Sequence, residues 1–419
     1  MRRLSAYTTW LVLHGVGSLA GALIFTVAAV YFVRDVGMNP FQLVLCGTVM
    51  ELAIFVFEVP TGVLADTYSR RASVIVGTLI QGSAFVLVGA IQSVPAVLAG
   101  YAIWGLGWTF ESGAIQAWIA DELGPERLPS VFLRGARAGY VGALAGIGLS
   151  VAIASYDLGL AIIAGGALTV LLGLFLIVAM PETGFKRGRA EEGEATGPKA
   201  FLRTARQGAG IVRGRPVLLL LLASAFFFGM WSESFDRLWE AHFLLLGLPA
   251  IGGLDPIVWF GIFGAGSMLI GLALTGPAAN RLEHASHATV GRVLFIFEAF
   301  LLVAALAFAL AGSFWLALAA YFAVRTARGI ANPLFDAWLN QSIDDSSVRA
   351  TVLSITNQSD AIGQVAGGPA LGGIGTIVSI RAALSAGAVA LLPSLWLFGR
   401  AIKHDGRDSE LSSSAARAG

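Results

Sequence analysis

The sequence has little charge and almost no cysteine. Only 13% of its 419 residues are Asp, Glu, Lys or Arg, and Cys46 is its single cysteine. Soluble domains carry about 25% charged residues, so this composition excludes a water-soluble globule with an ordinary polar surface. A single cysteine excludes a disulfide scaffold. We expect no metal site and no cofactor, because no cluster of histidine and cysteine is present, and the net charge of +1 gives no reason to expect nucleic acid.

Apolar residues, in contrast, are abundant: 56% of the chain is hydrophobic and its mean hydropathy is +0.77. A helix needs about 20 apolar residues to cross a bilayer, and twelve runs qualify, six on each side of a polar segment. The alternating segments of a membrane β-barrel are missing. The sequence therefore predicts an all-α membrane protein whose twelve transmembrane helices form two six-helix bundles. The runs lie near 6–33, 41–64, 72–92, 95–120, 131–154, 157–180, 216–246, 256–279, 289–311, 313–341, 350–379 and 382–401.

Four segments follow from this pattern. We expect an N-terminal bundle at 1–180, a C-terminal bundle at 216–403 and a disordered cytoplasmic tail at 404–419. The segment 181–215 between the bundles is rich in Gly, Glu, Lys and Arg and is typical of a cytoplasmic linker. The sequences AIQAWIADE and LFDAWLNQS occupy matching places in the two halves, which favours an internal duplication.

The basic residues predict the orientation. Most of the 27 Lys and Arg residues fall in segments that would share one side of the membrane, among them Arg70 and Arg71, whereas Arg34 and Arg381 fall on the other side. Cytoplasmic loops carry the excess of basic residues. We therefore expect a multi-pass protein of the cell membrane, with both termini in the cytoplasm and its helices in contact with membrane lipids.

The loop between the second and third runs carries a motif. It reads Gly62-Val-Leu-Ala-Asp66-Thr-Tyr-Ser-Arg70-Arg71, which resembles the loop signature of the major facilitator superfamily, Gly-x-Leu-Ala-Asp-basic-x-Gly-Arg-basic. In physical terms, Gly62 permits two helices to approach closely, and Asp66 can pair with an arginine in one conformation and release it in another. We interpret Gly62, Asp66, Arg70 and Arg71 as a conformational switch loop. The alternative is a topology signal with an aspartate that caps a helix.

A second sequence is similar to the antiporter-type pattern Gly-Pro-x-x-Gly-Gly of the same superfamily. It reads Gly368-Pro369-Ala-Leu-Gly372-Gly373 and lies in the eleventh run, whereas the family pattern belongs in the fifth. We interpret these four residues as helix packing or gating positions. The resemblance to the superfamily implies two rocking bundles, alternating access to a small-molecule substrate, and a monomer.

Charged residues inside the runs are the candidates for substrate binding and coupling, because one at the bilayer centre costs about 2.5–3.5 kcal/mol. Glu233 and Asp236 share a helix face, and Arg237 lies one turn after Glu233 and can neutralise it. Arg325 and Arg328 have no acid within a turn, which implies a partner on another helix or an anionic substrate. For each residue a structural ion pair remains the alternative. The remaining candidates are Glu58, Glu111, Asp336 and Asp360; Glu298 is a further acid within a run, with no role assigned.

Secondary transport is the function that these features favour, because no nucleotide-binding loop Gly-x-x-x-x-Gly-Lys-Ser/Thr is present. Acidic residues within runs that are rich in aromatic residues and glycine favour proton-coupled efflux of a small amphipathic or cationic compound. In this interpretation Glu233 and Asp236 carry the proton, and Glu111 and Asp360 are the alternative carriers. Uptake or facilitated diffusion of a small metabolite stays open. A membrane-embedded enzyme is disfavoured because no nucleophile elbow or pair of metal-spaced histidines occurs. A sensor is disfavoured because we expect no soluble output domain.

Overall fold

A computed structural model describes residues 3–185, 216–282, 287–343 and 346–418. These residues form helices joined by short loops and, apart from one isolated bridge between Ile251 and Leu254, no β-structure. The prediction of an all-helical fold is confirmed. Most of the predicted linker, 186–215, lies outside the described residues.

Each of the twelve predicted runs corresponds to one helix or to a pair of consecutive helices. Pairs occur where the backbone breaks within a run, as between α5 and α6. In chain order the helices are α1 (Ala6–Phe25), α2 (Ala28–Arg34), α3 (Pro40–Thr67), α4 (Arg70–Ala90), α5 (Val94–Glu111), α6 (Ala114–Leu123), α7 (Leu128–Ala154), α8 (Leu158–Ala179), α10 (Pro216–Leu246), α11 (Val258–Leu282), α12 (His287–Leu310), α13 (Phe314–Gln341), α14 (Ser346–Ile377), α15 (Ile380–Val389) and α16 (Leu391–Ala418).

Short polar residues set where many of these helices begin. At the start of α3, Asn39 and Gln42 form a reciprocal capping box with each other's backbone N–H groups. Elsewhere a side-chain oxygen accepts a hydrogen bond from the backbone three residues on, which satisfies an otherwise unpaired helix donor. The residues that cap in this way are Ser5, Ser69, Ser93, Asp157, Ser313 and Ser379.

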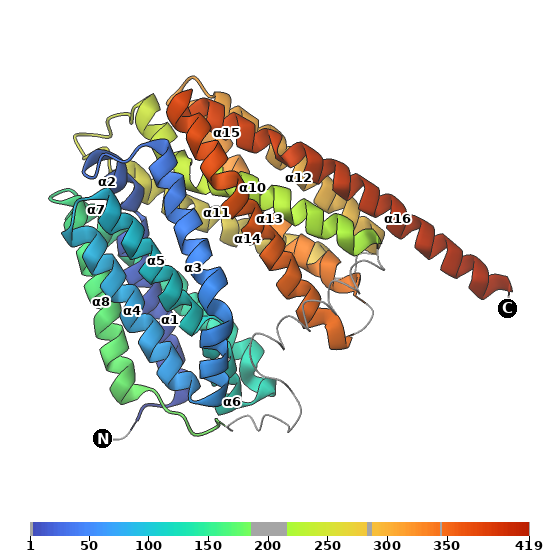
Figure 1. The fold of residues 1–419 in the computed structure, drawn as a ribbon, viewed down its shortest axis with the longest axis horizontal. Helices are drawn as coiled ribbons and strands as arrows, with labels where there is room; N and C mark the ends of the chain where they lie inside the picture. The colour runs from blue at the N-terminus through green and yellow to red at the C-terminus, as the bar shows by residue number, and fades with distance from the viewer. Residues whose placement is uncertain (1–2, 186–215, 283–286, 344–345, 419) are drawn as a thin grey trace. The chain divides into compact units, whose positions relative to one another are not determined.

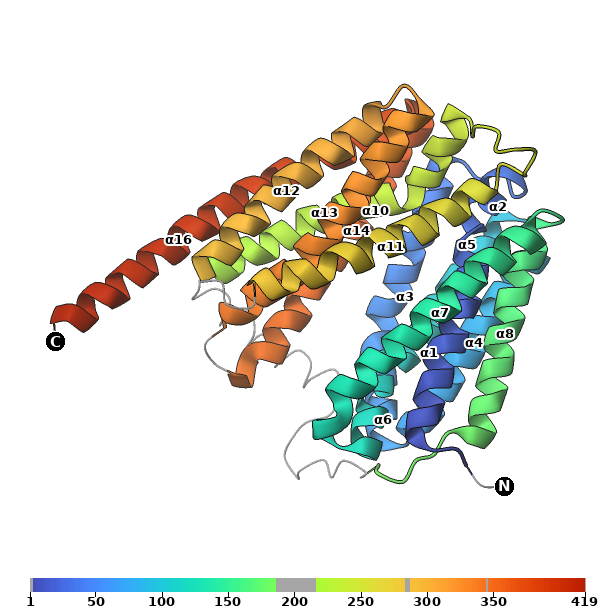
Figure 2. The same ribbon diagram turned by 180° about the vertical axis from the view of Figure 1, so that it is seen from behind.

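The described helices belong to two compact units. One comprises Met1–Phe201 with Ala250–Ala265, and the other Leu202–Pro249 with Gly266–Gly419, so that α11 is divided between them. In the first unit α1 packs on α7 and α8, and α4 packs on α5 and α8 (Figure 1). In the second unit α10 packs along α14 and α16, and α12 along α13 (Figure 2). The bundle limits 1–180 and 216–403 stay predictions.

The repeated Ala-Trp pair has the same place in each unit. Trp118 of α6 is 1% exposed and lies in a cluster with Trp10 and Leu176. Trp338 of α13 is fully buried in the corresponding cluster of the second unit, with Leu294 among its neighbours. The sequence match between the two halves therefore marks an equivalent core position.

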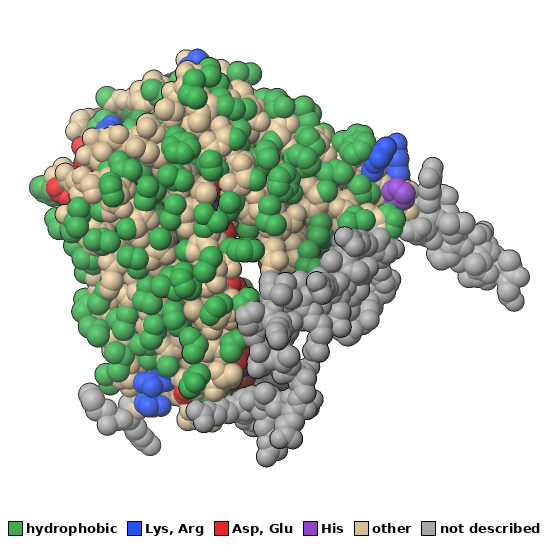
Figure 3. Space-filling view, in the orientation of Figure 1, with side chains coloured by type: hydrophobic (Ala, Val, Ile, Leu, Met, Phe, Trp, Pro, Cys, Tyr) green, Lys and Arg blue, Asp and Glu red, His purple; other side chains and the backbone are tan. Residues whose placement is uncertain are grey.

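The outer surface is apolar, as a bilayer requires. On α12, Ile296, Phe300 and Val303 form one face by their spacing, and Ile296 and Val303 are 63% and 64% exposed. Figure 3 shows hydrophobic side chains spread over the described part of one face, with few charged side chains among them. Among the described residues, eight helices or helix pairs are long and apolar enough to cross a membrane. Helix α13 is not one of the eight, since Arg325, Arg328 and Asp336 interrupt its apolar run.

Helix α16 continues to Ala418, whereas the sequence analysis expected a disordered tail over 404–419. Extending an existing helix adds one hydrogen bond per residue and needs no new nucleus. Because α16 is already formed upstream, it can propagate through this polar segment.

Glycines set the close packing of α1 against α7. A Cβ at Gly142 would lie 2.0 Å from the backbone oxygen of Gly15, so only glycine fits there without displacing backbone. We expect Gly142→Val to destabilise the protein by about 1–3 kcal/mol, the usual cost of overpacking, and to lower its thermal unfolding midpoint in detergent. Gly148→Val is the matched control, because no described atom lies within 4 Å of a Cβ at that position of α7. Equal unfolding midpoints for the two variants would contradict this packing role.

Candidate functional site

The charged turn of α10 carries the first ion pair. Glu233 is 2% exposed, and its carboxylate accepts a hydrogen bond from Nε of Arg237 at 3.2 Å. One helical turn separates the two residues, as expected for an i,i+4 pair. The buried acid predicted from the sequence thus has the neighbour that the spacing indicated.

A second pair joins two helices. Nη1 of Arg328 on α13 lies 2.7 Å from both carboxylate oxygens of Asp236 on α10. The rings of Phe228 and Trp231 lie 5.6 and 5.5 Å from the same guanidinium, a range in which a cation is attracted to an aromatic face. The partner that Arg328 required on another helix is therefore Asp236.

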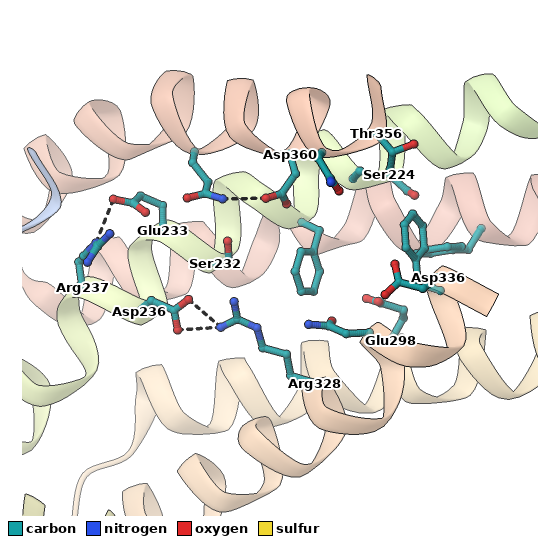
Figure 4. A pocket seen from close by; sticks show the side chains of 17 residues that line it. Ser224, Ser232, Glu233, Asp236, Arg237, Glu298, Arg328, Asp336, Thr356 and Asp360 are labelled. Carbon is teal, nitrogen blue, oxygen red and sulfur yellow. Dashed lines mark hydrogen bonds and ion pairs between the residues drawn. The ribbon is translucent and has the colours of Figure 1, made fainter. Parts of the chain in front are cut away.

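These residues line a cavity of about 460 Å³ within the second unit. On α14, Gln364 donates a hydrogen bond of 2.7 Å to Asp360, and Asn357 lines the same wall. Phe335 of α13 and Phe398 of α16 give the cavity aromatic walls. Figure 4 shows the two ion pairs toward one end of the view and the labelled side chains of Glu298 and Asp336 toward the other.

The charges of the cavity do not balance. Its acids outnumber its bases, since only Arg237 and Arg328 are cationic. Each of these guanidiniums already contacts a carboxylate. A cavity of this kind favours a positively charged guest or bound protons over an anion. The acidic residues that line it are Glu233, Asp236, Glu298, Asp336 and Asp360.

Three predicted residues lie elsewhere. In the first unit, Thr78 donates a hydrogen bond of 2.5 Å to Glu111, and Ser112 donates one of 2.9 Å to Glu58. Arg325 is exposed and does not line the cavity. The structure thus gathers Glu233, Asp236, Arg237, Asp336 and Asp360 into one cavity, while Glu58, Glu111 and Arg325 stand apart from it.

The switch loop joins α3 to α4. Arg70 contacts Asp121 of α6 by an ion pair, donates to the Ala117 carbonyl at 3.2 Å, and lies 3.4 Å from Asp66. Asp66 is 70% exposed, so it is the loosely held member of this group. No described atom lies within 4 Å of a Cβ at Gly62, so the close helix approach expected at Gly62 is not found.

One acid that was not among the predicted residues forms hydrogen bonds with the same loop. Glu182, after α8, accepts hydrogen bonds from the Ser69 hydroxyl at 2.7 Å and from the backbone N–H of Arg71 at 2.9 Å. This carboxylate therefore stabilises the start of α4, where a helix favours negative charge. No local pattern predicts this contact, because 111 residues separate Glu182 from Arg71.

The expected packing glycines of α14 contribute unequally. Gly368 and Gly372 are buried and Pro369 lies inside the helix, whereas Gly373 has no described atom within 4 Å of its Cβ position. The closest approaches to α10 occur at two glycines that lie just before this sequence. There, a Cβ at Gly363 would lie 2.0 Å from the Phe226 carbonyl oxygen, and one at Gly367 would meet Met230.

Among the described residues, no group of three or more His, Cys, Asp and Glu side chains could hold a metal ion. The side chains that line the cavity can form ion pairs and hydrogen bonds, and its carboxyl groups can exchange protons.

Curated relatives match this chain in part. It is 30% identical to the uncharacterized MFS-type transporter YxaM of Bacillus subtilis (strain 168) over 86 residues, 20% of this chain and 22% of that protein. It is 27% identical to the uncharacterized MFS-type transporter Rv0849 of Mycobacterium tuberculosis (strain ATCC 25618 / H37Rv) over 226 residues, 48% of this chain and 49% of that protein. The matches thus span about half of these relatives or less.

Solved structures share the fold along almost the whole chain. A bacterial homolog of the human lysosomal transporter Spinster, inward-facing and occupied, aligns with a TM-score of 0.73 and 14% identity over 95% of this chain and 96% of that one. The nucleoside transporter NupG aligns with a TM-score of 0.69 and 14% identity over 96% and 100%. Such identities show a common fold alone. The family model of the Major Facilitator Superfamily matches residues 10–367, and the chain therefore belongs to this superfamily of multi-pass membrane transporters and is not an enzyme.

Proposed function

We propose that this transporter exports small amphipathic cations in exchange for protons, by alternating access between its two halves. It acts in the cell membrane as a monomer, with both termini in the cytoplasm. The observation that carries the proposal is the excess of carboxyl groups over guanidiniums in the cavity of the second unit. A cation entering this cavity gains electrostatic stabilisation that an anion of equal size does not.

Coupling is assigned to Glu233 and Asp236. Each lies beside an arginine, so a proton that reaches either carboxylate breaks an ion pair and frees a guanidinium. Burial disfavours the charged form of a carboxyl group, and a nearby cation favours it. Protonation and cation binding therefore exclude each other at this cluster, which is what exchange requires. Glu111 and Asp360 are the alternative proton carriers.

We expect proton-driven transport to depend on both acids. In proteoliposomes with an imposed pH gradient, wild type should move a labelled organic cation against its concentration gradient. Glu233→Gln and Asp236→Asn should each lower the gradient-driven rate by at least about tenfold, since a neutral amide cannot exchange a proton. Glu240→Gln, one turn beyond Asp236 on α10 but outside the cavity lining, is the matched control.

Three outcomes would contradict the proposal. Unchanged proton dependence in both variants would move coupling to another carboxyl group. Loss of coupling in Glu240→Gln would show that the cavity is not the coupling site. A wild-type rate indifferent to the pH gradient would instead favour facilitated diffusion or uptake of a metabolite, for which Asn332, Asn357 and Gln364 supply hydrogen-bonding groups in the cavity.

A further inference from the structure

Glu298 is the one acidic residue of α12, and it points away from the apolar surface. Its neighbours Ile296, Phe300 and Val303 form the exposed face of the helix, whereas Glu298 is 4% exposed and lines the cavity. Asp336 of α13 lines the same cavity, and Figure 4 shows both side chains among those that surround it. The helix thus turns a single charge-bearing side chain inward.

This carboxyl group has no partner among the described residues. None of them forms a hydrogen bond or an ion pair with it, and Arg237 and Arg328 are held by Glu233 and Asp236. A buried charge without a counter-charge is costly in a protein interior and more so within a membrane. An ionised Glu298 is therefore stabilised by a positive charge that enters the cavity from outside the chain, and a proton neutralises it when no such charge is bound.

The surroundings suit an organic cation. Asp336 adds a second carboxyl group at the same end of the cavity, also without a side-chain partner among the described residues. The rings of Phe335 and Phe398 line the cavity with their centroids 6.0 Å apart. Aromatic faces together with a carboxylate are the groups that recognise ammonium and related onium ions.

We propose that Glu298, assisted by Asp336, binds the positive centre of an aromatic monovalent cation and exchanges it for a proton. This inference rests on the proposed function and assigns substrate recognition to the end of the cavity opposite the two ion pairs. Glu298 is then a binding residue, distinct in role from Glu233 and Asp236. Binding of the cation and protonation of Glu298 are mutually exclusive at this carboxyl group.

Other charged groups that face the cavity also affect its pH response. They come from α10, α13 and α14, whereas the cavity-lining residue of α16 is the uncharged Phe398. The part of a proton effect on binding that is attributed to Glu298 is therefore the part that a Glu298 variant loses and that persists when another acid is neutralised. The groups concerned are Glu233, Asp236, Arg237, Arg328, Asp336 and Asp360.

The test measures binding of tetraphenylphosphonium to the full chain in lipid nanodiscs by equilibrium dialysis. Binding of tetraphenylborate, an anion of the same size and shape, is measured in a separate sample. In wild type we expect saturable binding of the cation that is stronger than binding of the anion and that weakens as the pH falls from about 8 to about 6, because protons compete for the carboxylate. Glu298→Gln should raise the Kd at least tenfold, about 1.4 kcal/mol, and should reduce the pH effect.

Two further variants make the result specific. Asp336→Asn should weaken binding less than Glu298→Gln and should leave a pH effect. Glu240→Gln, an acid of α10 that does not line the cavity, should bind like wild type. Thermal unfolding of each purified variant shows whether it is folded. If Glu298→Gln does not fold, Glu298→Asp replaces it in the test because it keeps the charge. Glu298→Asp should bind the cation in preference to the anion.

The inference and the proposed function fail differently. Wild-type affinity and pH response in Glu298→Gln would overturn the assignment of Glu298 while leaving a cation exporter in place. Binding of tetraphenylborate to wild type as tight as that of the cation would overturn it as well, because the site would then recognise shape and not charge. Absence of saturable cation binding to wild type would overturn both.

Discussion

Arg328→Gln should lower transport by at least about tenfold, because it leaves the Asp236 carboxylate in the cavity without its counter-charge. Arg328 contacts both oxygens of Asp236 at 2.7 Å and packs against two aromatic rings. Removing one member of a sheltered ion pair is more harmful than removing both, because the remaining charge stays desolvated. We therefore expect a lower thermal unfolding midpoint for Arg328→Gln than for wild type.

The double variant Asp236→Asn/Arg328→Gln separates stability from transport. It removes both charges, so its unfolding midpoint should recover toward wild type, while proton-driven transport stays low because Asp236 is absent. Arg292→Gln replaces an exposed arginine of α12 and should leave both properties unchanged. If Arg328→Gln transports at the wild-type rate, the pair is a structural contact without a role in the cycle.

Hydrophobic runs and charge spacing predicted much of the molecule. Each run forms a helix or a pair of helices. A segment of about 20 apolar residues in a membrane must satisfy its backbone hydrogen bonds internally, and a helix does so. Asp360, a candidate because of its place within a run, also lines the cavity. The absence of an acid within one turn of Arg328 indicated a partner on another helix, which the structure supplies in Asp236.

Contacts between distant helices were not predictable in the same way. Helix α12 is apolar around most of its circumference, so its sequence does not reveal that Glu298 faces a cavity. Glu182 approaches the start of α4 only through the packing of α8 on α4. The break after Glu111 depends on Gly113, whose φ of 72° lies in the left-handed region. Such features arise from packing over long sequence separations, which helix periodicity does not encode.

The second large effect concerns the loop between α3 and α4. The contacts of Arg70 are unequal: Asp121 and the Ala117 carbonyl hold it, while Asp66 lies at 3.4 Å and remains largely exposed. An exposed ion pair contributes only about 0.2–1 kcal/mol to stability. Asp66 is therefore dispensable for folding in this conformation, and we propose that it pairs more closely with an arginine in the other conformation of the transport cycle.

We expect Asp66→Asn to leave the amount of membrane-inserted protein near the wild-type level but to lower transport about 5- to 150-fold, the range of a typical conformational coupling energy. The amide keeps the size of the side chain and removes the charge, so the balance between conformations shifts without disturbing a core. Transport in proteoliposomes, normalised to the protein incorporated, measures the effect. Asp157→Asn is the matched control, since asparagine also caps a helix and Asp157 caps α8. Normal transport by Asp66→Asn would show that Asp66 serves only membrane topology, and equal losses in both variants would show a general effect of removing a loop charge.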